Sequence, residues 1–106
     1  MGLTKTEAFT KSQVEFAAIA KALGHPARIA ILQVLADKKS CICGDIVDEL
    51  PLSQSTVSQH LKELKSVGII KGEIEGPSVC YCIDEKVMQK VKASFDKLFT
   101  SINTCC

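Results

Sequence analysis

The chain has six cysteines, and they stand in three close pairs: Cys41 and Cys43, Cys80 and Cys82, and Cys105 and Cys106. Deprotonated thiols are soft ligands, so such pairs favour trivalent arsenic, cadmium, lead, copper(I) or zinc over magnesium or calcium. Paired thiols can also be oxidised to a disulfide. The types and spacing of these residues therefore predict either binding of a thiophilic ion or thiol redox chemistry.

The even number of cysteines also fits the disulfide framework of a secreted protein. The N-terminus, however, carries charges of both signs and lacks the continuous apolar stretch of a signal peptide. The chain of 106 residues is 46% hydrophobic and 24% charged, and no apolar run approaches the roughly 20 residues of a membrane span. We therefore expect one globular domain over residues 1–106, located in the cytoplasm and without a membrane partner.

Helical periodicity predicts four helices in the first two thirds of the chain, at about residues 5–21, 26–37, 44–50 and 54–67. Pro26 suits the first turn of the second helix, after the break at Gly24 and His25. The segment Pro51–Ser53 separates the third and fourth helices by three residues, the length of the turn in a helix-turn-helix. Ser53 is a good N-cap for the fourth helix. We therefore expect a helix-turn-helix over residues 44–67.

The fourth helix has two distinct faces. Val57, Leu61 and Leu64 form a stripe that packs inward, and the opposite face carries hydroxyl, amide and lysine side chains. Such groups can read base edges in a major groove and contact phosphates. Because the net charge is only +1, DNA binding has to be argued from this pattern. The expected DNA-binding residues are Gln54, Ser55, Thr56, Ser58, Gln59, His60, Lys62, Lys65 and, in the following strand, Lys71.

The last third of the chain predicts a hairpin and a fifth helix. Residues 69–75 and 78–83 alternate as two strands around Gly76 and Pro77, which makes residues 69–83 a wing. Asp84 caps a helix over residues 84–102, whose apolar stripe needs a partner to cover it. We expect the first and last helices to pair across a two-fold axis in a homodimer. The stripe comprises Val87, Val91, Phe95, Leu98 and Ile102.

Four segments resemble the ArsR-type metalloregulatory repressors: Leu23-Gly-His-Pro-Ala-Arg-Ile-Ala-Ile-Leu32, Cys41-Ile-Cys43-Gly-Asp-Ile, Ser53-Gln-Ser-Thr-Val-Ser-Gln-His-Leu-Lys-Glu-Leu64 and Gly68-Ile-Ile. The resemblance covers about residues 14–100. It implies a dimeric winged helix-turn-helix repressor that leaves a palindromic DNA operator when a metal or metalloid ion binds. The chain is then not an enzyme, and the ion is its inducer, with no organic cofactor.

The resemblance places the arsenic and heavy-metal ligands at Cys41 and Cys43, at the start of the third helix. The arsenic version of the site has a third cysteine three residues later, where this chain has Ile46. The cadmium and lead version uses cysteines of the N-terminal arm, and residues 1–40 contain none. The tail, residues 103–106, offers Cys105 and Cys106, which resemble a two-thiol site for trivalent arsenicals. The expected inducer is therefore arsenite, an organoarsenical or a similar thiophilic ion.

The other candidate ligands rank lower. Cys80 and Cys82 lie on one face of the second wing strand, where a free cysteine often fills the core as a small hydrophobic side chain. The family's zinc site on the last helix needs a histidine, and residues 84–102 contain none. His25 and His60 are expected to form structural hydrogen bonds, with His60 bracing the fourth helix. The wing tip carries Glu73 and Glu75 where the family usually offers arginine.

Three alternative functions can be compared with the sequence pattern. A repressor of the same fold could sense oxidants or persulfides through its paired thiols. A thiol–disulfide enzyme would usually show Cys-x-x-Cys in a strand–helix–strand unit, which this sequence lacks. A winged-helix module for protein contacts would not depend on the polar face of the fourth helix.

Overall fold

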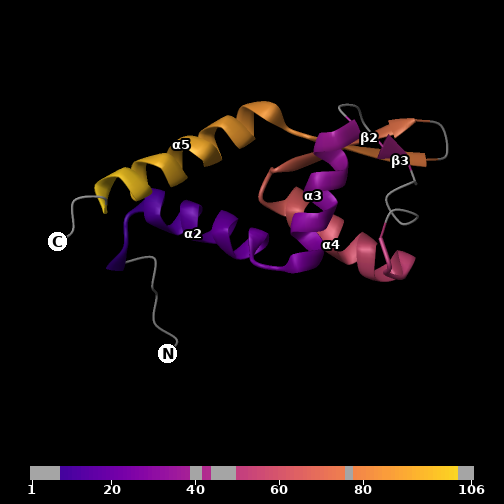
Figure 1. Cartoon of the computed structure of the whole chain (residues 1–106), viewed down its shortest axis with the longest axis horizontal. Coiled ribbons are helices and arrows are strands. Elements are labelled where there is room, and N and C mark those ends of the chain that lie inside the picture. The colour runs from indigo at the N-terminus through magenta and orange to yellow at the C-terminus, as the bar shows by residue number, and fades with distance from the viewer. Residues whose placement is uncertain (1–7, 39–41, 44–49, 76–77, 103–106) are drawn as a thin grey trace.

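The computed structural model describes residues 8–38, 42–43, 50–75 and 78–102. Within these residues lie four helices and three strands: α2 (Lys11–Leu23), α3 (Pro26–Lys38), β1 (Ile42–Cys43), α4 (Gln54–Ser66), β2 (Ile70–Glu75), β3 (Ser78–Ile83) and α5 (Glu85–Ser101). Figure 1 shows α3, α4 and the strands at one end of the molecule and the paired α2 and α5 at the other. The mainly helical architecture with a small antiparallel wing is confirmed.

Local capping decides where the helices begin. The helix expected over residues 5–21 is not continuous, because Thr10 forms a capping box with Gln13 and α2 begins at Lys11; the expected start at Lys5 lies outside the described residues. The Thr10 hydroxyl accepts from the Gln13 amide at 3.1 Å, and the Gln13 side chain accepts from the Thr10 amide at 3.0 Å. Pro26 opens α3, and Ser53 and Asp84 cap α4 and α5, as predicted.

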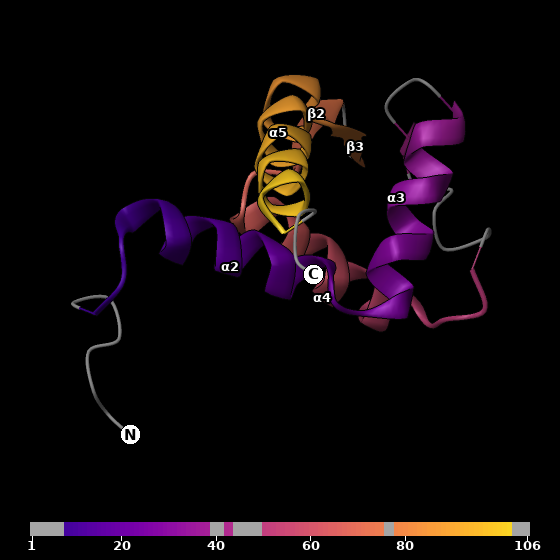
Figure 2. The same ribbon diagram turned by 60° about the vertical axis from the view of Figure 1, so that its left-hand side comes forward.

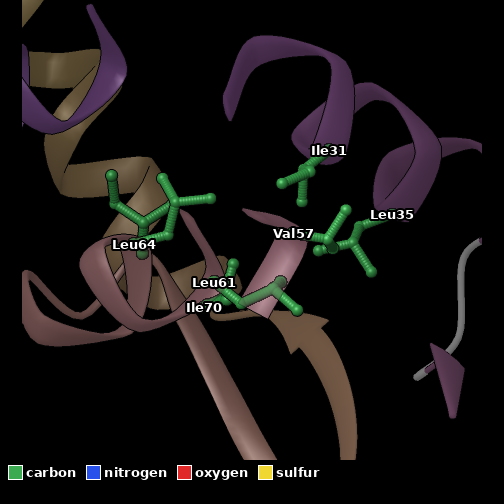
Figure 3. Close-up of a cluster of buried hydrophobic side chains, with 7 residues drawn as sticks. Ile31, Leu35, Val57, Leu61, Leu64 and Ile70 are labelled. Atoms are coloured by element: carbon green, nitrogen blue, oxygen red, sulfur yellow. The ribbon is translucent and has the colours of Figure 1, made fainter. Parts of the chain in front are cut away.

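The core joins α3, α4 and the start of the wing. Figure 3 shows Ile31 and Leu35 of α3 facing Val57 and Leu61 of α4. All of these side chains are buried, as expected for the inward stripe of the fourth helix. Burial of such apolar side chains contributes roughly 1.5–3 kcal/mol each, so this cluster fixes how α4 sits on α3. The cluster comprises Ile31, Leu35, Val57, Leu61, Leu64, Ile69 and Ile70.

The strands form one antiparallel sheet in the order β1-β3-β2. The hairpin of β2 and β3 matches the predicted wing, and β1 is an additional strand on its far side. Cys43, expected at the start of a helix, lies instead in β1, where Ile42 and Cys43 pair with Tyr81 and Cys80. The helix predicted over residues 44–50 falls outside the described residues apart from Leu50, which is not helical.

Helices α2 and α5 contact one another (Figures 1 and 2). The rings of Phe16 and Phe95 meet edge to face with their centroids 4.8 Å apart. Toward the end of α5 the apolar side chains become exposed: Leu98 by 43%, Phe99 by 56% and Ile102 by 58%. The single chain therefore leaves part of this apolar surface uncovered. None of the helices among the described residues is long and apolar enough to cross a membrane.

Candidate nucleic-acid interface and thiol sites

The polar face of α4 is exposed along its whole length. Val57, Leu61 and Leu64 are buried, which turns the other side of the helix outward. In the described part of the chain, neither Ser58 nor Gln59 has a hydrogen-bond partner for its side chain. These side chains are therefore available to another molecule. The exposed residues of this face are Gln54, Ser55, Thr56, Ser58, Gln59, Lys62 and Lys65, and Lys71 is exposed in β2.

Hydroxyl groups organise the N-terminus of α4. The Ser53 side chain accepts from the Thr56 amide at 3.3 Å and donates to the Thr56 hydroxyl at 2.9 Å. It also lies 3.3 Å from the Ser55 hydroxyl. This arrangement satisfies one of the helix's first amide groups. The exposed helix N-terminus has a partial positive charge, which favours an approaching phosphate.

Arg28 ties α4 to the two preceding helices. Its Nε donates to His60 Nδ1 at 3.1 Å, and its terminal nitrogen donates to the Ala22 carbonyl at 3.1 Å. The expected bracing role of His60 is confirmed by this contact, whereas Arg28 was not expected as its partner. Arg28 does stand in the Leu23–Leu32 block, so its position there was the available signal. The bridge fixes the orientation of α4 from its half-buried side.

His25 completes this polar cluster. Its Nδ1 accepts from the Ala27 amide at 3.0 Å, as expected of a structural histidine. The imidazole rings of His25 and His60 lie with centroids 4.4 Å apart. Burial lowers the pKa of His60 below its ordinary value of 6.5, and the charges of His25 and Arg28 lower it further. His60 is therefore held neutral, with Nδ1 free of a proton and able to accept from Arg28.

The sheet brings Cys43 of the first cysteine pair opposite Cys80 of the second. Cys43 is the Cα partner of Cys80 across β1 and β3. Cys80 is fully buried, as expected of a small apolar side chain, but it lies outside the cluster around Ile31 and Leu64. Both Cys80 and Cys82 are disulfide-bonded in this structure, so the interpretation of them as free thiols that fill the core is corrected. Cys41, Cys105 and Cys106 lie outside the described residues.

Known proteins are similar to this chain in sequence and in fold. The model of the arsR family of bacterial regulatory proteins matches residues 25–71. An HTH-type transcriptional regulator of Methanocaldococcus jannaschii is 44% identical over 78 residues, 72% of this chain and 86% of the relative. A cadmium resistance transcriptional regulatory protein CadC homolog of Staphylococcus aureus is 34% identical over 93 residues, 86% of this chain and 76% of the relative. This chain belongs to the arsR family.

A solved structure agrees with the fold of this arsR-family chain. An ArsR-like transcriptional regulator from Rhodococcus sp. RHA1 superposes with a TM-score of 0.74 at 19% identity, covering 89% of this chain and 88% of that one. The family consists of DNA-binding transcriptional regulators and not of enzymes. The exposed polar face of α4 lies within residues 25–71, the part of the chain that the family model matches.

The pairing of β1 with β3 is the feature of this arsR-family chain that sequence reasoning missed. A signal existed, because Cys-Ile-Cys and Cys-Tyr-Cys both alternate with the period of two that strands show. The two segments were nevertheless expected to form separate sites. Within the described residues no group of three or more cysteine, histidine or acidic side chains stands in metal-binding geometry.

Proposed function

We propose that this protein is a transcriptional repressor that binds a palindromic operator as a homodimer and leaves it when a thiophilic ion binds. The observation that carries the proposal is the exposed polar face of α4, held in place by the buried stripe and by the Arg28–His60 bridge. In this proposal Ser58 and Gln59 read base edges, and Lys62 and Lys65 contact phosphates. The protein would act in the cytoplasm, where the operator is.

The proposed ligands of the ion are Cys41 and Cys43, completed by Cys105 and Cys106. The relative named for cadmium resistance supports a thiophilic ion in general. Trivalent arsenic is the favoured inducer, because organoarsenicals need only two thiols and residues 1–40 supply no cysteine for the cadmium arrangement. For release, the ion must prefer the dimer geometry that fits the operator less well.

The test is fluorescence anisotropy of labelled promoter DNA from upstream of the protein's own gene. Trivalent arsenic, methylated trivalent arsenic, Cd(II), Pb(II) and Zn(II) are titrated against the reduced complex. We expect release by arsenicals, with a coupling of about 1–3 kcal/mol, or roughly 5- to 150-fold in DNA affinity. Cys41→Ser should abolish this response and leave the affinity of the ion-free protein unchanged. A complex that ignores every ion, or a Cys41→Ser variant that responds like the parent, contradicts the proposal.

The DNA-reading assignment has its own test. Gln59→Ala should weaken operator binding by about 1–3 kcal/mol, because an amide that pairs with adenine loses both of its hydrogen bonds. Gln89→Ala, at an exposed glutamine of α5, is the matched control and should bind like the parent. If the Gln59 variant also binds like the parent, α4 serves another purpose, such as a protein contact.

A second candidate is a repressor that senses oxidants through its thiols. The disulfide bonds at Cys80 and Cys82 favour it. In this case hydrogen peroxide alone, in buffer with a metal chelator, releases the operator, and a thiol reductant restores binding. Release by arsenicals but not by peroxide favours the first candidate.

A further inference from the structure

The sheet β1-β3-β2 places a cysteine of the segment before the helix-turn-helix directly against the wing. Cys43 in β1 is the Cα partner of Cys80 in β3. Residues directly opposite one another in an antiparallel pair have Cα atoms about 4.5–5.5 Å apart. This separation falls within the range of about 4.4–6.8 Å that a disulfide spans. The backbone register alone therefore places the Cα atoms of these two residues at a separation that a disulfide can span.

Other partners for Cys80 fit less well. On its other side Cys80 is opposite Glu73 of β2, and Cys82 is opposite Lys71. Cys80 and Cys82 are two residues apart along one strand, a separation of roughly 6.6 Å at the upper limit for a disulfide. Among the described residues, Cys43 is the cysteine that the sheet presents to Cys80. Cys80 is disulfide-bonded in this structure, and the backbone register makes Cys43 the candidate partner on which our proposal is built.

We propose that Cys43 and Cys80 form a reversible disulfide across β1 and β3, and that this disulfide blocks the response of the protein to its ion. The proposal rests on the proposed function in one respect, that Cys43 is a ligand of the inducing ion. In the oxidised form its sulfur is bonded to that of Cys80 and cannot act as a thiolate ligand. The oxidised repressor therefore stays on the operator when arsenic is present.

The chemistry needs a hydroperoxide as oxidant. One thiolate attacks the O–O bond of hydrogen peroxide and becomes a sulfenic acid as hydroxide leaves. The thiolate of the other cysteine then attacks the sulfenic sulfur, forms the S–S bond and expels a second hydroxide. Together with the two thiol protons, the products are one disulfide and two molecules of water. A cytoplasmic thiol reductant reverses the reaction by thiol–disulfide exchange.

The position of the bond explains why DNA binding should survive oxidation. Cys80 and Cys82 are disulfide-bonded in this structure, and in it α4 presents its polar face and keeps the Arg28–His60 bridge. The bond joins β1, which precedes the helix-turn-helix, to β3, which leads into Asp84 and α5. It therefore holds the described arrangement of the wing in place.

The first experiment maps the bond. Reduced protein in chelator-containing buffer is treated with hydrogen peroxide, its remaining thiols are alkylated, and non-reduced peptides are sequenced by tandem mass spectrometry. We expect a peptide pair joined through Cys43 and Cys80 that disappears after reduction. Pairing of Cys80 with any other cysteine, or no bond at Cys80, overturns the proposal whatever ion the protein senses.

The second experiment tests the block by the anisotropy assay. It uses a Cys82→Ser background, which leaves Cys80 as the one cysteine of β3. The reduced variant should release DNA with trivalent arsenic, and the peroxide-treated variant should lose at least nine tenths of that response. Cys80→Ala added to Cys82→Ser keeps a small apolar side chain at the buried site and should respond to arsenic after either treatment. An equal response of the oxidised and reduced Cys82→Ser protein, or release by peroxide alone, overturns the block.

The experiments distinguish failure of the proposed inducer from failure of the proposed disulfide. If the reduced protein ignores arsenic, the proposed inducer is wrong, and the peptide map still decides whether the Cys43–Cys80 bond exists. If the reduced protein responds and the map lacks this bond, the repressor function stands and the disulfide does not.

Discussion

At the scale of single residues, the orientation of α4 depends on a small polar cluster. Arg28 donates to His60 on α4 and to the Ala22 carbonyl in the last turn of α2. His60 can accept from Arg28 only while its Nδ1 carries no proton. Protonation of His60 would also place a positive charge on its imidazole ring, beside Arg28 and His25. The charge state of one half-buried imidazole is therefore coupled to the packing of three helices.

This coupling predicts a pH dependence of stability. The pKa of His60 is lower in the folded chain than its ordinary value of 6.5, chiefly because of burial. The unfolded state consequently binds more protons between the two pKa values, so the free energy of unfolding rises with pH in this range. The contribution is complete above pH 6.5 and is lost as the pH falls through 6.5 toward the lower folded pKa. Urea unfolding midpoints between pH 5 and pH 8 measure it.

His60→Gln is the matched control for the pH dependence. The glutamine side-chain oxygen can accept from Arg28 but does not titrate, so the variant should lose the part of the slope just below pH 6.5 that belongs to His60. The two proteins differ at no other titrating residue. Identical slopes in the parent and the variant would show that His60 does not carry the effect.

At the scale of elements, Gly68 sets the angle between α4 and the wing. It has a φ of +83°, a conformation that L side chains rarely adopt. The Ile69 amide donates to the Leu64 carbonyl at 3.2 Å, and the Gly68 amide donates to the Lys65 carbonyl at 3.0 Å. These two bonds form the Schellman motif that commonly ends a helix at a glycine. The motif lets β2 begin directly after α4.

Gly68→Ala should lower the free energy of unfolding by about 1–2 kcal/mol, because a side chain in the left-handed conformation is strained. A Cβ at this position would meet nothing within 4 Å, so strain in the backbone is the whole effect. Gly24→Ala is the matched control: its φ is −82° and its added Cβ would lie 3.4 Å from the nearest atom, an ordinary contact. Chemical denaturation should find the Gly24 variant close to the parent. Equal losses in both variants would contradict this account.

Element boundaries that depend on local signals were predictable from the sequence. Pro26, Ser53, Gly68 and Asp84 each mark an end of a helix, and the inward stripe of α4 follows from periodicity alone. The strand β1 was not predictable in this way. It has only two residues, and pairing with β3, far along the chain, determines its conformation.

In the candidate site, too, the residues with a local pattern were predictable from the sequence and the long-range contacts were not. The exposed side chains of α4 were identified from their spacing, since the opposite stripe had to face the core. The Arg28–His60 contact joins residues 32 positions apart, and the Cys43–Cys80 register joins residues farther apart still. Contacts of this kind depend on how elements pack, and a single sequence carries no local pattern for them.

At the scale of the whole molecule, α2 and α5 form an arm (Figures 1 and 2), and apolar side chains are exposed toward the end of α5. Along the stripe of α5, Val91 is buried, Phe95 is half-buried, and Leu98 and Ile102 are exposed. The aromatic contact of Phe95 with Phe16 joins the two helices within one chain, and Phe95 also contacts Phe99 within α5. The exposed end of the stripe is continuous with this intramolecular contact, so a second copy of the arm could extend it. Exposed apolar patches of this kind usually mark interfaces.

Dimer formation through this arm is therefore the last prediction. Leu98→Glu places a charge in the proposed interface, where burying it without a partner would cost several kcal/mol. Analytical ultracentrifugation should find the parent as a dimer and the variant shifted toward monomer, with weaker binding to the palindromic operator and little change for a half-site. Because Leu98 is 43% exposed in the single chain, circular dichroism of the variant should remain that of a folded protein.

Gln89→Glu is the matched control for the dimer, because it adds the same charge to α5 on the side of the helix opposite Leu98. It should leave the dimer intact. If Leu98→Glu sediments as the parent does, the arm does not join two copies. Two recognition helices would then need another two-fold contact to reach half-sites about one helical turn apart, since a palindrome is read by a protein of matching symmetry. Equal loss of dimer in both variants would instead point to a general effect of charge on α5.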